Sequence, residues 1–338
     1  MTPTNIRQVR KPDTRDEWLA ARKPYLGWSE VGAAMGLSPF KTPYQLWLEK
    51  TGRAEPETIN PESLRLGQYL EQYAADRYAE ETGRLVRNHN FMLFDDEHHV
   101  VADIDRLVVP DGEKIAAHQG EIRTDTLLEC KSSGVMWDDQ VPAFYQVQVQ
   151  GYLYSTGCIH ADFAVVWLSP RREFGCPVQK PWLRVERNQT MIDGSLDFAK
   201  GWFEKHIVGD LAPDAVSEDD CRKKFWRSKT GEVTATPRLL EVVDVMRSAQ
   251  ARADKAEEDI DLCRTEIMQA LGEADTLVGP DGRKLATWKS AKDREVVDWK
   301  AVADELAPEC EPAHVSKIIE ANTTSRPGAR TFRLAKAG

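Results

Sequence analysis

The sequence predicts an α/β protein with a mixed sheet flanked by helices, followed by a C-terminal helical arm with a small β-hairpin. The first observation is the order of segments, since helical patterns precede three strand-type patterns, and a further helix and strand follow. This order is typical of helices packed on a mixed sheet. The second is composition, because 338 residues with 41% hydrophobic and 30% charged side chains suffice for about two folded domains.

The N-terminal segments predict helices from caps and periodicity. Polar capping residues precede Trp18, and Trp18 and Arg22 are four residues apart, so they share one helix face. A short helix is expected over Ser29–Met35. A longer helix is expected over Leu64–Thr82, where apolar side chains recur at helical spacing and a glycine follows.

The central segments predict strands. Short runs rich in β-branched and aromatic side chains, separated by turn residues, are typical of strands. The expected strands are Phe91–Phe94, Val100–Val109, Thr126–Lys131, Phe163–Leu168 and Trp182–Val185. Helical patterns over Phe144–Tyr154 and Ser195–Val208 place one helix among these strands and another after them.

The C-terminal third has a different pattern. One long helix is expected over Pro237–Leu271, where apolar residues alternate in steps of three and four for about four heptads. A hairpin should follow around Gly279–Gly282. Further expected elements are helices over Val297–Leu306 and Val315–Ile319 and a strand over Arg330–Leu334. We therefore expect a domain over residues 1–215, a linker over 216–235 and an arm over 236–338 that serves oligomerisation or partner docking.

The net charge of −10 argues against a surface generally coated by nucleic acid. Much of this charge lies in Glu241–Asp275, which holds 10 acidic and 4 basic residues, a net of −6. By contrast, Cys221–Lys229 holds five basic residues and no acid, with Phe225 and Trp226 among them. This segment is either a single-stranded DNA contact that stacks bases or an exposed linker with a buried aromatic pair.

The cysteines and apolar runs exclude several classes. Six scattered cysteines form no CxxC pair, so neither a zinc nor an iron–sulfur site is expected. No run approaches the ~20 apolar residues of a membrane span, and the N-terminus has no signal-peptide pattern. Free thiols without a signal peptide lead us to expect a cytoplasmic protein.

Asp105, Glu129 and Lys131 are the main candidates for chemistry. Side chains alternate along a strand, so Glu129 and Lys131 should share one face while Cys130 points into the core. Two carboxylates from adjacent strands would form an oxygen-rich site of the kind Mg²⁺ prefers, and such an ion can activate water and neutralise phosphodiester charge. The alternative is a solvated Glu–Lys pair on a surface strand. Asp103 is a second candidate acid, since it should share a face with Asp105.

Further motifs stand in a fixed order around these residues. They are Trp18…Arg22, Gly27-Trp28-Ser29-Glu30, Gly67…Glu71, Ile104-Asp105-Arg106-Leu107, Glu129-Cys130-Lys131 and Pro142…Tyr145…Gln148-Val149-Gln150-Gly151. Over about residues 15–210 the combination resembles the YqaJ-type viral recombinase family, which is related to lambda exonuclease within the PD-(D/E)xK nuclease superfamily. The resemblance implies a restriction-endonuclease-like core. One departure is Ile104-Asp105-Arg106, where the family usually has Pro-Asp-Gly.

The resemblance also implies roles for individual residues. Asp105 and Glu129 would bind metal together with the Cys130 carbonyl, and Lys131 would be the catalytic lysine. Glu71 would be an accessory acid that reaches a second metal directly or through water. Gln148 would position the site from its helix. The implied DNA-binding residues are Arg22 and Ser29, which would hold a terminal 5′-phosphate, together with Gln150 and Tyr152.

The implied activity is an exodeoxyribonuclease that degrades one strand of linear double-stranded DNA from 5′ to 3′. It would use Mg²⁺, with Mn²⁺ as a substitute and two ions per site. Its 3′ single-stranded product would pass to a single-strand annealing protein in phage-type recombination within a bacterial host. The family also suggests a homo-oligomer, a trimeric ring around DNA. Two alternatives are an endonuclease of the same superfamily and a non-catalytic DNA-binding or recombinase-loading module.

Overall fold

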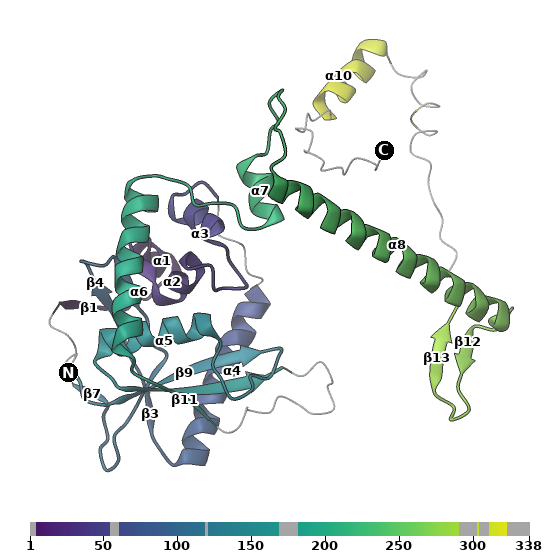
Figure 1. Ribbon diagram of the computed structural model, residues 1–338. Helices are drawn as coiled ribbons and strands as arrows, with labels where there is room; N and C mark the ends of the chain where they lie inside the picture. Colours follow the sequence, from purple (N-terminus) through teal and green to yellow (C-terminus); the bar gives the residue numbers. More distant parts are fainter. Residues whose placement is uncertain are drawn as a thin grey trace. The chain divides into compact units, whose positions relative to one another are not determined.

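The centre of the first part of the chain is a five-stranded mixed sheet with strand order β11-β10-β9-β6-β3 (Figure 1). The computed structural model describes residues 5–54, 61–118, 121–168, 182–290, 303 and 311–322, and the chain divides into two units, Met1–Lys224 and Phe225–Gly338. The strands are β3 (Val86–Asn88), β6 (Arg106–Val108), β9 (Thr126–Ser133), β10 (His160–Trp167) and β11 (Leu183–Glu186). The strands β9 and β10 are parallel, and the other neighbours are antiparallel.

Helices cover both faces of this sheet, which confirms the predicted mixed sheet flanked by helices. The helices of the first unit are α1 (Arg15–Arg22), α2 (Trp28–Ala34), α3 (Pro43–Lys50), α4 (Pro61–Thr82), α5 (Ala143–Thr156), α6 (Gln189–Trp202) and α7 (Glu218–Lys224). Leu127 of β9 belongs to the core cluster that includes Leu153 of α5. The next residue, Leu128, belongs to the cluster that includes Tyr78 of α4. Alternation along β9 thus assigns one face to α5 and the other to α4.

A second sheet has the strand order β1-β4-β5-β2. Its strands are β1 (Ile6–Arg10), β2 (Leu26–Gly27), β4 (Phe91–Asp95) and β5 (Val100–Ala102). The single strand expected over Val100–Val109 is wrong, because β5 lies in this sheet and β6 in the other. The connecting residues Asp103, Ile104 and Asp105 cross between the two sheets, and Ile104 is fully buried at the crossing.

The junction of α2 with α5 depends on Gly151. A Cβ atom at this position would lie 1.8 Å from Cδ2 of Trp28, so only glycine lets the indole ring pack directly on the backbone of α5. The indole Nε1 also donates a hydrogen bond to Ser155 Oγ at 3.3 Å. The Gly27–Glu30 motif is thereby fixed against the helix that carries Gln148.

A short hairpin and a π-helix are further described elements of the first unit. The hairpin β7 (Ala117–His118) with β8 (Glu121–Ile122) follows β6, and the π-helix η2 (Phe203–Val208) continues α6. The helix expected over Ser195–Val208 therefore begins earlier and ends in a π-helix. Within the expected linker 216–235, α7 packs on the first unit, since its buried Asp220 accepts a hydrogen bond from Thr42 Oγ1 at 2.8 Å.

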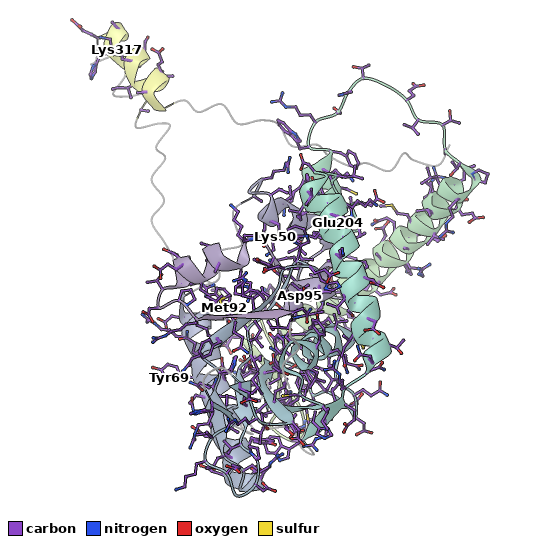
Figure 2. The ribbon with its side chains drawn as sticks, turned by 90° about the vertical axis from the view of Figure 1, so that its left-hand side faces the viewer. Lys50, Tyr69, Met92, Asp95, Glu204 and Lys317 are labelled. Carbon is purple, nitrogen blue, oxygen red and sulfur yellow. The ribbon has the colours of Figure 1, made fainter. Side chains whose placement is uncertain are left out.

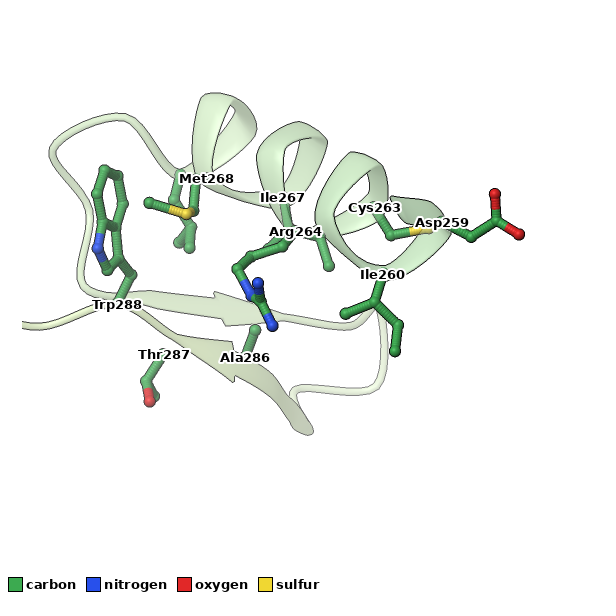
Figure 3. A pocket seen from close by; sticks show the side chains of 10 residues that line it. Asp259, Ile260, Cys263, Arg264, Ile267, Met268, Ala286, Thr287 and Trp288 are labelled. Atoms are coloured by element: carbon green, nitrogen blue, oxygen red, sulfur yellow. The ribbon is translucent and has the colours of Figure 1, made fainter. Parts of the chain in front are cut away.

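The second unit consists of the long helix α8 (Pro237–Leu271), the hairpin β12 (Thr276–Val278) with β13 (Lys284–Thr287), and the helix α10 (Pro312–Asn322). The predicted long helix and hairpin are confirmed. A groove of about 560 Å³ lies between the hairpin and the end of α8 (Figure 3). Apart from residue 303, the elements expected over 297–306 and 330–334 lie outside the described residues. None of the described helices is long and apolar enough to cross a membrane.

Candidate metal centre and active site

Asp105 and Glu129 lie together where the hydrogen bonding between β6 and β9 ends. The last pair of this ladder is Arg106 with Leu128. Beyond it the Asp105 carboxylate replaces a backbone partner, because its Oδ2 accepts a hydrogen bond from the Cys130 backbone N at 3.0 Å. The divergence of two strands therefore places the first predicted acid beside the strand segment that carries the second.

Glu129 and Lys131 share one face of β9, as the alternation predicts, and this face lies beneath α5. The Lys131 Nζ atom lies 2.5 Å from Glu129 Oε1. Gln148 of α5 donates a hydrogen bond from Nε2 to the same Oε1 at 2.8 Å and another to the Tyr152 hydroxyl at 2.9 Å. Glu129 is only 1% exposed, so the alternative of a solvated surface pair is wrong.

The electrostatics of this site are those of a buried acid beside another acid. Burial raises the pKa of Glu129 to about 8, and the negative charge of Asp105 adds to the shift, against the effect of Lys131. Burial would lower the pKa of Lys131, but Glu129 and Asp105 outweigh it and raise that pKa overall. The Lys131 ammonium therefore stays charged, and a cation bound beside Glu129 would favour its ionised carboxylate.

The donor set fits a hard divalent cation. Glu129 Oε2 is buried and has no hydrogen-bond partner. A buried carboxylate oxygen without a donor is costly, and an ion bound between Glu129 and Asp105 would remove that cost. No three His, Cys, Asp or Glu side chains among the described residues converge as a complete ligand set. Mg²⁺ sites commonly use one or two carboxylates, with water and substrate phosphates as the remaining ligands.

Glu71 lies beside this centre but is paired with an arginine. Its Oε1 accepts a hydrogen bond from Arg106 Nη1 at 2.7 Å. Burial and the charge of Asp105 raise the pKa of Glu71, while Arg106 opposes them. The family resemblance implies Glu71 near the metal centre, whereas no sequence motif predicts its ion pair with Arg106.

Asp103 does not join Asp105. Its Oδ2 accepts a hydrogen bond from Trp18 Nε1 at 2.8 Å, and its carboxylate forms an ion pair with Lys11. The expectation that Asp103 and Asp105 share one strand face is wrong, because the residues between the sheets do not form a strand. Asp103 instead accepts a hydrogen bond from α1, while Asp105 lies beside the β9 segment that carries Glu129.

Arg22 and Ser29 lie at the end of α1 and the start of α2, on either side of β2. The Arg22 guanidinium lies 4.3 Å from the ring centroid of Trp18, which confirms their shared helix face. Its Nη2 is 4.0 Å from Glu30 Oε2. Ser29 is exposed in the first turn of α2.

A buried lysine completes this cluster and was not predicted. Lys50 lies on α3 (Figure 2). Its Nζ is 2.8 Å from Glu30 Oε2, and its side chain is 7% exposed. The Gly27 backbone N donates a hydrogen bond to the same Glu30 oxygen at 2.6 Å. Burial would raise the pKa of Glu30, but Lys50 and Arg22 lower it overall. The cluster thus holds two cations against one carboxylate.

The remaining predicted DNA-binding residues are buried. Tyr152 lies beneath the metal centre, where its hydroxyl accepts the hydrogen bond from Gln148. Gln150 is 2% exposed, donates a hydrogen bond to the Glu186 carbonyl and accepts one from the Asn188 backbone N. Gln150 therefore connects α5 to the end of β11 and, contrary to the expectation, presents no surface to DNA.

Residues 17–159 match the model of the YqaJ-like viral recombinase domain. This segment is similar to a YqaJ-like viral recombinase domain. It contains Arg22, Glu71, Asp105, Glu129, Lys131 and Gln148. The motifs that carried the resemblance therefore lie together within the matched domain.

Several known proteins are similar to this chain at low sequence identity. The uncharacterized protein YqaJ of Bacillus subtilis (strain 168) is 28% identical over 229 residues, which cover 65% of this chain and 66% of that protein. The alkaline exonuclease of Laribacter hongkongensis is 21% identical, with 57% of this chain and 93% of that chain covered and a TM-score of 0.42. A phage-related exonuclease from Haemophilus somnus 129PT is 11% identical, with coverages of 55% and 96% and a TM-score of 0.38.

Proposed function

We propose that the YqaJ-like domain makes this protein a metal-dependent exodeoxyribonuclease that degrades one strand of linear duplex DNA from its 5′ end. The observation that carries the proposal is the Glu129 carboxylate, buried between Lys131 and Asp105 with one oxygen lacking a partner. A structural ion pair would have both oxygens satisfied. An acid left in this state is typical of a site that binds a cation.

Individual residues of the chain would have separate roles in phosphodiester hydrolysis. Asp105, Glu129 and the Cys130 carbonyl would hold Mg²⁺, which Mn²⁺ could replace, and such an ion neutralises charge on the phosphate and activates water. Gln148 fixes the Glu129 carboxylate by its hydrogen bond. The charged Lys131 ammonium is placed to hold a phosphate oxygen or to orient the attacking water. Removal of Lys131 should therefore abolish turnover without loss of the fold.

The Arg22 cluster supports the proposed 5′ polarity. Arg22 and Lys50 against Glu30 leave one net positive charge, and the exposed Ser29 hydroxyl stands beside it in the chain. Guanidinium groups bind phosphates through paired, charge-assisted hydrogen bonds. An enzyme that anchors a terminal 5′-phosphate begins at that end and releases a 3′ single strand for an annealing protein.

The arm of the second unit supports a role in assembly. Apolar side chains are exposed along the heptad seam of α8, and they include Leu239, Val242, Met246, Ile260 and Ile267. We propose that α8 packs on another subunit or on the annealing protein, and a trimeric ring around DNA would favour processive cleavage. Light scattering of the chain truncated after residue 235 tests packing on another subunit, since an unchanged number of subunits per particle would exclude a role of the arm in oligomerisation.

End-labelled duplexes test the activity. Digestion of 5′-phosphate and 5′-hydroxyl duplexes is followed with and without Mg²⁺, beside Asp105→Ala, Glu129→Ala and Lys131→Ala. We expect Mg²⁺-dependent release of nucleotides from phosphorylated ends in the wild type alone. Full activity of Lys131→Ala would refute the assigned roles. Cleavage of a covalently closed circle would instead establish an endonuclease, and binding without cleavage in Mg²⁺ and Mn²⁺ a loading module.

A further inference from the structure

Arg106 is a buried cation at the edge of the metal centre. It begins β6, directly after Asp105, and is 9% exposed. Its Nη1 donates hydrogen bonds to Glu71 Oε1 at 2.7 Å and to the Asp105 carbonyl at 2.8 Å. Its Nη2 donates to Gln72 Oε1 at 3.2 Å. The guanidinium therefore joins α4 to the chain segment that supplies the first acid.

These contacts determine whether the Glu71 carboxylate pairs with Arg106 or binds a metal ion. A carboxylate held by a buried arginine offers little charge to an ion on its other side. With Arg106 in place, three carboxylates (Asp105, Glu129 and Glu71) face two cations, Lys131 and Arg106, and the centre carries a net charge of −1. Without the guanidinium charge the same centre would carry −2, and Glu71 would be free to bind metal.

We propose that Arg106 is a positioning residue that holds Glu71 away from the metal, so that the DNA-free protein binds one divalent ion rather than two. This inference rests on the proposed metal centre. It replaces the two ions implied by the family resemblance with one ion held by Asp105, Glu129 and the Cys130 carbonyl. Glu71 then acts on the centre only through its pair with Arg106.

The test is the binding of Mn²⁺ alone to the full-length protein, measured by electron paramagnetic resonance of the free ion and by titration calorimetry without DNA. We expect one Mn²⁺ in the wild type. Arg106→Gln should bind a second ion or bind the first at least about tenfold more tightly, because loss of a buried unit positive charge beside the centre strengthens the attraction between a divalent ion and the carboxylates. The control Arg77→Gln removes a partly exposed arginine of α4, the helix that carries Glu71, and should leave binding unchanged.

The double variant Glu71→Gln/Arg106→Gln removes the pair without changing the net charge. It should return to one ion with the wild-type affinity, which a merely structural role of Arg106 would not produce. The inference is overturned if the wild type binds two ions, or if the double variant loses the ion that the wild type binds. The inference is also overturned if Arg106→Gln has a native circular dichroism spectrum and binds Mn²⁺ with the stoichiometry and affinity of the wild type. If the wild type binds no Mn²⁺, the proposed metal centre itself fails.

Discussion

Replacement of Gly151 by alanine tests the packing that links the two candidate sites. The added Cβ would lie 1.8, 2.1 and 2.3 Å from three atoms of the Trp28 ring. These atoms belong to a rigid indole that is 1% exposed, so α2 must move away from α5. Overpacking of a core costs about 1–3 kcal/mol, and a clash with a fixed ring belongs at or above the upper end of that range. We expect a loss of about 3 kcal/mol or more in the free energy of unfolding.

Thermal denaturation measures this loss against a matched control. For a domain of about 200 residues, each kcal/mol shifts the Tm by roughly 2–4 °C, so Gly151→Ala should lower it by about 6–12 °C. Gly194 lies in α6, and a Cβ there meets no atom within 4 Å. Gly194→Ala should therefore raise stability by about 0.5–1 kcal/mol through helix propensity. Equal Tm values for Gly151→Ala and the wild type would refute the close approach of Trp28.

Three further predictions concern the sites themselves. As the pH is raised toward 8, Mn²⁺ binding should tighten by up to about tenfold per pH unit, because burial raises the pKa of Glu129 and the ion must displace its proton. An affinity that does not depend on pH would contradict this. Mg²⁺ at 100 times its Kd should stabilise the fold by about 2.7 kcal/mol, and chelation or Glu129→Gln should abolish this gain in thermal scans. Trp18→Phe should lower the preference for 5′-phosphate ends about threefold to tenfold, since Asp103 loses a hydrogen bond, with unchanged Mn²⁺ stoichiometry.

The parts of the site that depend on local geometry could be predicted from the sequence. Glu129 and Lys131 share a face because alternation is a property of any strand. Gln148 and Tyr152 meet because residues four apart share a helix face. The same rule separates Gln150 from Gln148, since residues two apart point in different directions. That signal was present in the sequence and argued against Gln150 as a DNA ligand.

The parts that depend on tertiary contacts could not be predicted. In the segment Val100–Val109, Asp103 and Asp105 alternate with apolar residues as they would along one strand, so the pattern predicts one strand where there are two. Arg106 and Lys50 find their acidic partners, Glu71 and Glu30, on other elements. Spacing along the chain does not determine such pairs, because they depend on how helices pack beside the sheets.

The change of sheets also joins the two candidate sites through three residues. Asp103 holds Trp18, whose ring lies against Arg22, while Asp105 holds the Cys130 backbone in the metal centre. Ile104 between them is fully buried, so its packing fixes the backbone that carries both acids. The proposed anchor for the 5′-phosphate and the proposed cleavage centre, joined this closely, should keep a fixed spacing. We therefore expect products of one uniform length, and mixed lengths from the wild type would show that the two sites move independently.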